Sequence, residues 1–162
     1  MVKVLVAYFS SSGNTEAMAR RIAEGAEAEG ATVEVKSVEQ VSFEDLLEAD
    51  AIVLGSPTYY GTMAAQLKDL IDRSVELHGQ LDGKVGAAFS SAGGVGGGQQ
   101  TTITDILHAL MIHGMVVQGD PHSHHYGPVA VGAPDEEASA SCRRWGQRIA
   151  ALAKRLAGES GL

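Results

Sequence analysis

A cluster of small hydroxyl and amide side chains follows the first apolar segment of the chain. The apolar run at residues 2–9 predicts a buried strand, and apolar spacing predicts an amphipathic helix over residues 15–29. The start of a helix offers unpaired backbone N–H groups and the positive end of the helix dipole, which favour a bound phosphate. A polar turn capped by Asn14 or Thr15 explains the same residues equally well. The residues of this loop are Ser10, Ser11, Ser12, Gly13, Asn14 and Thr15.

Two more loops of unusual composition follow predicted strands. The strand at residues 50–55 leads into a second loop at residues 56–62, whose candidate binding residues are Pro57, Thr58, Tyr59, Tyr60 and Gly61. Its two tyrosines could stack on a flat ring, and the proline would fix the approach of the chain. The strand at residues 84–90 leads into a loop whose glycines would let backbone N–H groups come close to ring atoms. That loop consists of Ser91, Ala92, Gly93, Gly94, Val95, Gly96, Gly97 and Gly98. Ordinary tyrosine packing and a flexible glycine linker are the alternatives.

Strand and helix patterns alternate along the whole chain. Strands are predicted at residues 2–9, 31–38, 50–55, 84–90 and 115–117, and helices at 15–29, 43–48, from about 63, at 99–112 and at 134–156. This alternation predicts one α/β domain over residues 1–162, a three-layer sandwich with a five-stranded parallel sheet in the flavodoxin-like order 2-1-3-4-5. Ligands of such sheets bind at the carboxyl ends of the strands, beside the switch point between strands 1 and 3. The three loops follow strands 1, 3 and 4, so we expect them to form one crevice.

Composition excludes several classes of protein. The chain has 162 residues, 44% of them hydrophobic and 20% charged, as in globular domains. A net charge of −8 argues against a nucleic-acid or membrane surface, and no apolar run reaches membrane-spanning length. The N-terminus enters a strand without a signal peptide, and the single Cys142 excludes an internal disulfide framework. A cytoplasmic location is therefore expected.

The three loops favour FMN over other phosphate-containing ligands. No Gly-Lys-Ser/Thr closes the first loop, which argues against a P-loop nucleotide triphosphatase. The only run that resembles a dinucleotide fingerprint, at residues 94–96, follows strand 4 instead of strand 1. Neutral hydroxyls and amides suit a phosphate monoester, and the tyrosine and glycine loops suit an extended planar ring. A phosphate tail joined to such a ring describes FMN.

The same segments resemble the flavodoxin superfamily, and most closely its WrbA-type NAD(P)H:quinone oxidoreductases. The matching pieces are residues 10–15, 55–58, 61–63, 91–99, 101–103, 113–115 and 126–127. The resemblance implies that Ser10–Thr15 hold the FMN phosphate and that Pro57–Gly61 and Ala92–Gly98 hold the isoalloxazine ring. It also implies that His113 approaches the ring face where nicotinamide and quinone bind in turn.

The chain departs from that family at places that affect substrates more than FMN. The segment at residues 41–49 is short where the family has a long insertion tied to tetramer assembly. Ser12 stands where an aromatic residue is common, and residues 74–79 lack a tryptophan that walls the quinone pocket, with Glu76 near that place. The third loop has one extra residue. Nicotinamide and quinone specificity therefore do not follow from the resemblance.

Two functions remain open for an FMN protein of this kind. The first is an enzyme that passes reducing equivalents from NAD(P)H through FMN to a quinone. The second is a flavodoxin-type carrier that shuttles single electrons to a redox partner protein. Residues 90–104 contain no carboxylate, so amides facing the ring would stabilise negative charge and favour two-electron chemistry. A dimer or tetramer is expected, since the shallow ring face would need a neighbour to deepen it.

Several histidines and one thiol could suggest other chemistry. Asp120, His122, His124 and His125 are residue types of a metal site, but no thiolate lies near them. Prolines and glycines around them suggest a mobile loop, either solvated or covering the flavin edge, and no metal is predicted. His113 has a structural alternative, because a helix C-terminus favours histidine. Cys142 is expected to be buried and unreactive. A solvated helix face is expected from Arg143, Arg144, Arg148, Lys154 and Arg155.

Overall fold

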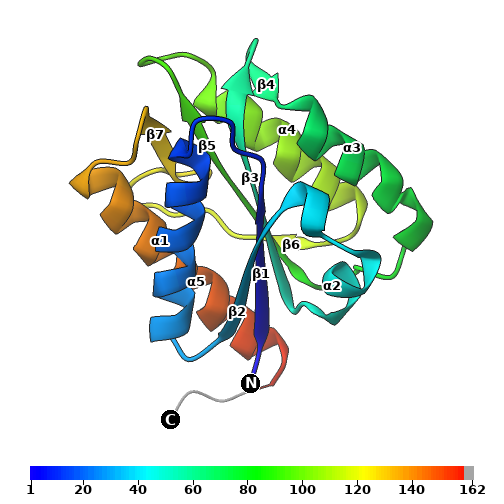
Figure 1. Ribbon diagram of the computed structural model, residues 1–162. Helices are drawn as coiled ribbons and strands as arrows, with labels where there is room; N and C mark the ends of the chain where they lie inside the picture. The colour runs from blue at the N-terminus through cyan, green and yellow to red at the C-terminus, as the bar shows by residue number, and fades with distance from the viewer. Residues whose placement is uncertain (159–162) are drawn as a thin grey trace.

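The computed structural model describes residues 1–158 as a parallel sheet with helices on both faces (Figure 1). The last four residues of the predicted domain, 159–162, lie outside the described part. Strands are β1 (Lys3–Tyr8), β2 (Thr32–Ser37), β3 (Ala51–Tyr59), β4 (Thr62–Met63), β5 (Val85–Ala92), β6 (Val116–Val117) and β7 (Val129–Val131). Helices are α1 (Asn14–Ala28), α2 (Phe43–Glu48), α3 (Ala65–Arg73), α4 (Gln99–Ile112) and α5 (Glu136–Leu156), with 3₁₀ turns η1 (Val38–Gln40) and η2 (Ser74–Leu77).

The sheet order is β2-β1-β3-β5-β6, with every neighbouring pair parallel. This confirms the predicted flavodoxin-like fold and its order of strands. Successive residues of a strand point to opposite faces, so the apolar run of β1 serves two cores. Val4 and Val6 pack with α1 and α5, whereas Leu5 and Ala7 pack with α2, α3 and α4. Figure 1 shows these two helical layers on either side of the sheet.

The predicted fifth strand at residues 115–117 is β6, and a further short strand that was not predicted, β7, lies on the same edge of the sheet. β6 pairs with Val85 and Gly86 at the start of β5, and β7 pairs with Ser90–Ala92 at its end. Residues 118–128, here called the histidine loop, leave the edge and return to it. At the return, Gly127 lies so close to the Ala88 carbonyl that no Cβ would fit. The chain therefore resumes its strand along the same edge of β5.

The predicted loop at residues 56–62 is wrong in its boundaries. β3 continues to Tyr59, because Ser56 and Pro57 still pair with β5, and then turns back into β4. Tyr60 and Gly61 form the two-residue turn with φ of 51° and 79°, the left-handed values typical of a type I′ hairpin. The third predicted loop likewise begins later, since Ser91 and Ala92 belong to β5.

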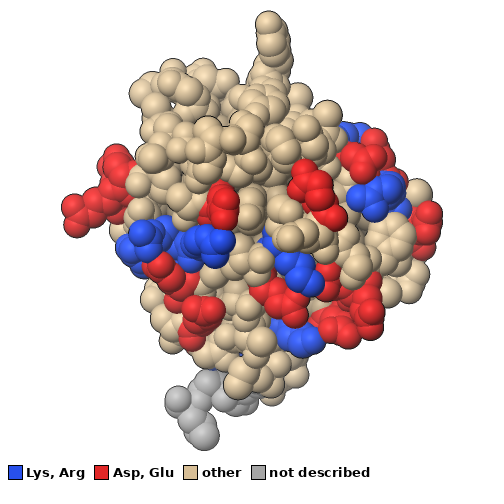
Figure 2. Space-filling view, in the orientation of Figure 1, with Lys and Arg blue, Asp and Glu red and all other residues tan. Residues whose placement is uncertain are grey.

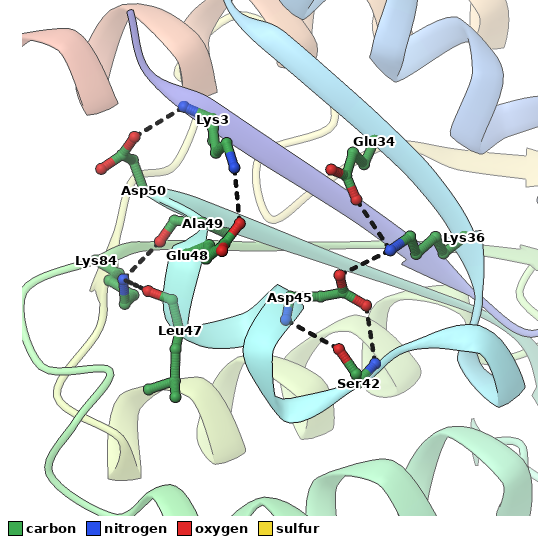
Figure 3. A network of polar contacts seen from close by, with 10 residues as sticks. All are labelled: Lys3, Glu34, Lys36, Ser42, Asp45, Leu47, Glu48, Ala49, Asp50 and Lys84. Carbon is green, nitrogen blue, oxygen red and sulfur yellow. Dashed lines mark hydrogen bonds and ion pairs between the residues drawn. The ribbon is translucent and has the colours of Figure 1, made fainter.

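Polar contacts from β2, from Lys3 at the start of β1 and from Lys84 before β5 hold α2 against the sheet (Figure 3). Ser42 caps α2 as predicted, in a reciprocal capping box with Asp45. Lys36 donates to the same Asp45 carboxylate at 2.7 Å, and Lys84 donates to the carbonyl of Ala49 at 2.6 Å. These contacts join α2 to both ends of the sheet, through Lys36 near the carboxyl end of β2 and Lys84 before β5. Within residues 1–158, no helix combines the length and apolarity needed to cross a membrane.

Candidate cofactor-binding site

The structure brings the three predicted loops together at the carboxyl ends of β1, β3 and β5. The Ser11 hydroxyl lies 3.0 Å from the Tyr59 hydroxyl, which joins the first loop to the β3–β4 hairpin. The Thr15 hydroxyl lies 3.0 Å from the Ser91 hydroxyl, which joins the first loop to the end of β5. Segments that lie far apart in the sequence therefore share one site, as the sheet order requires.

The first loop leaves backbone donors open at the start of α1. Gly13 is the N-cap, in place of the predicted Asn14 or Thr15, and no side chain caps this helix. The Gly13 N–H donates to the Ser10 hydroxyl at 3.1 Å, while Ser11 and Ser12 are exposed. A Cβ placed on Gly13 would meet no atom within 4 Å, so there is room for a ligand. An uncapped helix start beside exposed hydroxyls suits a phosphate.

Thr15 differs from the rest of its loop. Its side chain is 1% exposed and is hydrogen-bonded to Ser91, which is also buried. The hydroxyl therefore holds the helix start to β5, whereas the exposed part of the loop is formed by Ser11, Ser12 and Gly13.

A chain of hydroxyls supports the loops from below. The Thr102 hydroxyl donates to Thr58 at 3.3 Å, Thr58 lies 2.9 Å from the Ser90 hydroxyl, and Ser90 donates to the Ser56 carbonyl at 2.8 Å. Ser56 and Ser90 are fully buried. Satisfied buried polar groups of this kind rigidify the structure around them.

α4 fixes the hairpin, a role that the sequence analysis missed. The Thr101 hydroxyl donates to the Gly61 carbonyl at 2.6 Å, and the Thr62 hydroxyl donates to Asp105 at 2.7 Å. Gly98 comes so near that a Cβ there would lie 2.9 Å from the Gly61 Cα. Thr101 lies within residues 101–103, one of the segments that carry the family resemblance, and only that resemblance could have indicated its role from the sequence.

The ring-binding candidates surround open space. Gly93, Gly94 and Gly96 would each place a Cβ with no atom within 4 Å. A groove of about 410 Å³ runs between the glycine loop and β7, within the size range of small-molecule sites. Tyr60 is fully exposed at the hairpin tip, and Tyr59 is 43% exposed. The remaining ring-binding candidates lie in the same two loops or at the ends of β3 and β5. They are Pro57, Thr58, Gly61, Ser91, Ala92, Val95, Gly97 and Gly98.

His113 does not join this cluster within one chain. α4 begins at the glycine loop and runs back along the sheet, so its last residue lies about 20 Å from its first. His113 Nε2 lies 2.8 Å from the Ser74 hydroxyl, which itself donates to the Ile71 carbonyl. Nε2 is therefore the protonated nitrogen, and Nδ1 is buried without a hydrogen-bond partner. Burial, with a smaller effect of His78, lowers the pKa of His113.

The segments that form the candidate site contain no charged side chain of their own, although the Asp105 carboxylate of α4 accepts a hydrogen bond from Thr62 of the hairpin. Residues 4–15, 51–67 and 85–104 contain no Asp, Glu, Lys or Arg, although the chain has 32 such residues. Figure 2 shows this as an uncharged upper region above clustered red and blue side chains. The donors available to an electron-rich ligand are hydroxyls and backbone N–H groups.

Comparison with known proteins decides the family. The family model of NADPH-dependent FMN reductases matches residues 1–125. The chain belongs to this family. The match includes all three loops and His113, and it confirms the predicted resemblance to flavin-binding oxidoreductases.

Relatives of this FMN reductase family member include both enzymes and flavodoxins. An NAD(P)H dehydrogenase (quinone) of Azorhizobium caulinodans is 36% identical over 98% of this chain and 100% of its own length. A flavodoxin of Aquifex aeolicus is 42% identical over 93% of this chain and 86% of its own. A solved WrbA-like protein from Agrobacterium tumefaciens is 26% identical, with a TM-score of 0.82, covering 96% of this chain and 99% of that one. The Azorhizobium alignment spans 199 positions against 162 residues here, so that relative contains additional segments.

The histidine loop of this family member is held to α5 by a buried carboxylate. The Asp120 side chain is fully buried, and Arg144 donates to both of its oxygens, at 2.6 and 3.2 Å. This pairing holds the pKa of Asp120 far below its usual range. The loop is thus an internally bonded structure, not the mobile segment that its prolines and glycines suggested. No three His, Cys, Asp or Glu residues within positions 1–158 are grouped as metal ligands.

The basic residues of α5 are only partly a solvated face. Arg144 and Arg148 turn to Asp120, and Arg143 donates to Glu24 of α1 at 2.9 Å. No local pattern reveals these contacts, because the partners are 24 or more positions apart. Cys142 is buried, and burial raises the pKa of its thiol to about 12, so the thiol is unreactive.

Proposed function

We propose that this protein is an FMN-dependent oxidoreductase that passes reducing equivalents from NAD(P)H to a quinone or similar two-electron acceptor. Its family and its quinone dehydrogenase relatives support this assignment. The observation that carries it is that the three loops contain no charged side chain and offer neutral hydroxyls, an amide and backbone N–H groups to a ligand.

Different segments of the site would bind different parts of FMN. The exposed part of Ser10–Thr15 and the uncapped start of α1 would hold the FMN phosphate. The β3–β4 hairpin and the glycine loop would flank the ring, with Thr101 and the buried hydroxyls keeping both in place. When bound, FMN supplies the ability to accept a hydride and to release two electrons.

The protein's part in the chemistry is electrostatic. A hydride taken up by a bound ring would add negative charge there, and the backbone N–H groups of the glycine loop would stabilise that charge. Carboxylates would oppose it, and residues 85–104 contain none. The edge therefore favours full reduction over stopping after one electron.

A carrier function is the second candidate, and one finding favours it. The Aquifex relative, which is named a flavodoxin, is 42% identical to this chain, and the match covers 86% of its length. The net charge of −8 would suit a basic partner. These charges lie away from the site edge, however, whereas a docking partner would have to reach the ring itself.

We also propose that the protein works as a homo-oligomer. His113 reaches a ring only if a second copy presents it, because α4 separates it from the loops of its own chain. It lies in a groove of about 390 Å³ with exposed Val75 and Ile112, an apolar surface of the kind that assembly buries. Sedimentation at working concentration tests this, and a fully active monomer would refute it.

Anaerobic reduction tests the enzyme assignment. The FMN-loaded protein is mixed with NADH or NADPH and the loss of flavin absorbance is followed, then a quinone is added. We expect rapid bleaching and its reversal by quinone, with repeated turnover. Flavin that accepts electrons singly from dithionite and ignores both nucleotides would favour the carrier.

A further inference from the structure

The histidine loop ends in a contact between an imidazole and the edge strand. His124 Nδ1 accepts a hydrogen bond from the backbone N–H of Val129, at 3.0 Å. Val129 is the first residue of β7. Because an N–H group can only donate, this contact exists only while Nδ1 is unprotonated.

The loop fixes the position of that imidazole. His124 has φ of 49°, a left-handed value uncommon for a residue other than glycine, asparagine or aspartate. The Gly127 N–H donates to the His124 carbonyl at 3.0 Å, and Gly127 packs directly on Ala88 of β5. Asp120, held by Arg144, closes the other side of the loop through its N–H bond to the His125 carbonyl at 3.1 Å. The ring is therefore held at Val129.

β7 lies directly beside the candidate site. It pairs with Ser90–Ala92, and the Gly132 N–H donates to the Ala92 carbonyl at 2.8 Å. Ser91 is the residue that holds Thr15, and Ala92 leads into the glycine loop. β7 has only three residues, and two contacts fix its start: the His124 bond, and the Ser90 N–H, which donates to the Pro128 carbonyl at 3.1 Å.

We propose that His124 is a positioning residue of the cofactor site, which fixes β7 beside the glycine loop when neutral and releases it when protonated. Cofactor retention then weakens in acid. The identity of the cofactor as FMN rests on the proposed function, whereas the release of β7 does not.

Charged groups around His124 act in both directions. Asp135 and Glu137 at the start of α5, and Asp120 within the loop, favour the protonated ring. Burial and His125 oppose it, and burial is the largest effect, so the pKa of His124 lies below its ordinary value. The contact is thus intact above about pH 6.5 and is lost as the pH falls from there through the lowered pKa.

The decisive variant is His124→Asn. The asparagine oxygen occupies the same place in the side chain as Nδ1, accepts the same bond, does not titrate and tolerates left-handed backbone. His122→Asn is the matched control, because the His122 side chain is exposed in the same loop and its bond to Asp120 is made by the backbone N–H. Both are compared with wild type at pH values from 8 to 5.

Two readouts are measured. Amide hydrogen exchange of residues 129–132 in the cofactor-free protein, corrected for intrinsic rates, reports the edge strand alone. The FMN dissociation constant, from quenching of flavin fluorescence, reports the site. Titration of the FMN phosphate affects all three proteins equally, so it cancels in the ratio of wild type to variant.

In wild type and H122N we expect exchange to accelerate in acid, and H124N to lack this acceleration. The ratio of the wild-type to the H124N dissociation constant should be about 1 at pH 7.5 and at least about threefold by pH 5. Equal profiles in wild type and H124N, or an NMR titration that places the His124 pKa at or above 6.5, would overturn the inference. If neither protein binds FMN, the proposed function fails while the exchange readout still decides the role of His124.

Discussion

At the residue scale, the site depends on hydroxyls that hold backbone, more than on groups that react. Thr15 and Ser91 are both buried and bonded to each other, so each satisfies the other where water is excluded. Thr101, at an exposed position, donates to the Gly61 carbonyl and so fixes the hairpin. Such contacts determine where the open hydroxyls and N–H groups point, which is what a bound ring and phosphate require.

Ser91→Ala tests that role. Removing the hydroxyl leaves the buried Thr15 oxygen without its partner, which should cost about 1–3 kcal/mol of unfolding free energy. Urea unfolding measures the loss, and FMN affinity should fall with it. Ser123→Ala, at an exposed position of the histidine loop, should change neither quantity. Unchanged stability and affinity in S91A would show that the Thr15 contact is unimportant.

His113 should make stability depend on pH independently of the cofactor. Its folded pKa is lowered by burial, so the folded state binds fewer protons, and unfolding free energy falls as the pH drops below about 6.5. His113→Gln keeps a donor toward Ser74 and does not titrate. Urea midpoints at pH 7.5 and 5.5 should therefore differ less in H113Q than in wild type. The exposed His108→Gln should behave like wild type, and an H113Q protein that loses as much stability in acid as wild type would contradict the assignment.

At the element scale, regular patterns predicted the fold and failed where strands are short or interrupted. The helix at residues 99–112 was predicted at its observed bounds, and Ser42 was recognised as the cap of α2. The polar run at 56–59 was not recognised as a continuing strand, because its pairing, first with β5 and then with β4, depends on the assembled sheet and not on the local sequence. β7 has three residues and follows a loop fixed by Asp120 and Arg144, so no window along the chain reveals it.

The hairpin turn should respond to relief of backbone strain. Tyr60 has left-handed φ and a fully exposed side chain, so Tyr60→Asn should raise the free energy of unfolding by up to about 1 kcal/mol. Thermal unfolding measures this. Tyr59→Asn is the contrasting variant, since Tyr59 lies in β3 and contacts Ser11, and it should destabilise. A less stable Y60N would mean that the tyrosine side chain makes a contact that outweighs its strain.

At the scale of the whole molecule, charge is distributed unevenly. The net charge is −8, yet the segments that form the site edge contain no Asp, Glu, Lys or Arg (Figure 2). The charged surface could therefore attract a basic protein over a long range, whereas the uncharged segments would bind the neutral ring. The residues that could be predicted for the site are those of the three loops, whereas the proposed role of His113 requires a second copy and so depends on assembly, which no pattern within one chain predicts.

Turnover of an uncharged quinone should depend little on salt. With no charged side chain at the edge to attract or repel it, kcat/KM should change by less than about twofold between 20 and 300 mM salt. Stopped-flow reoxidation of the reduced protein measures this. A decrease of about tenfold or more would indicate electrostatic docking and favour the carrier.

The central claim is that the three loops form one flavin site that nicotinamide can reach. The most direct measurement is the visible spectrum of the purified protein, before and after anaerobic addition of NADH or NADPH. The account predicts a yellow protein, or one made yellow by added FMN, whose flavin absorbance is lost with either or both nucleotides and restored by quinone. A colourless protein that does not take up FMN, or a yellow one that neither nucleotide reduces, would contradict it.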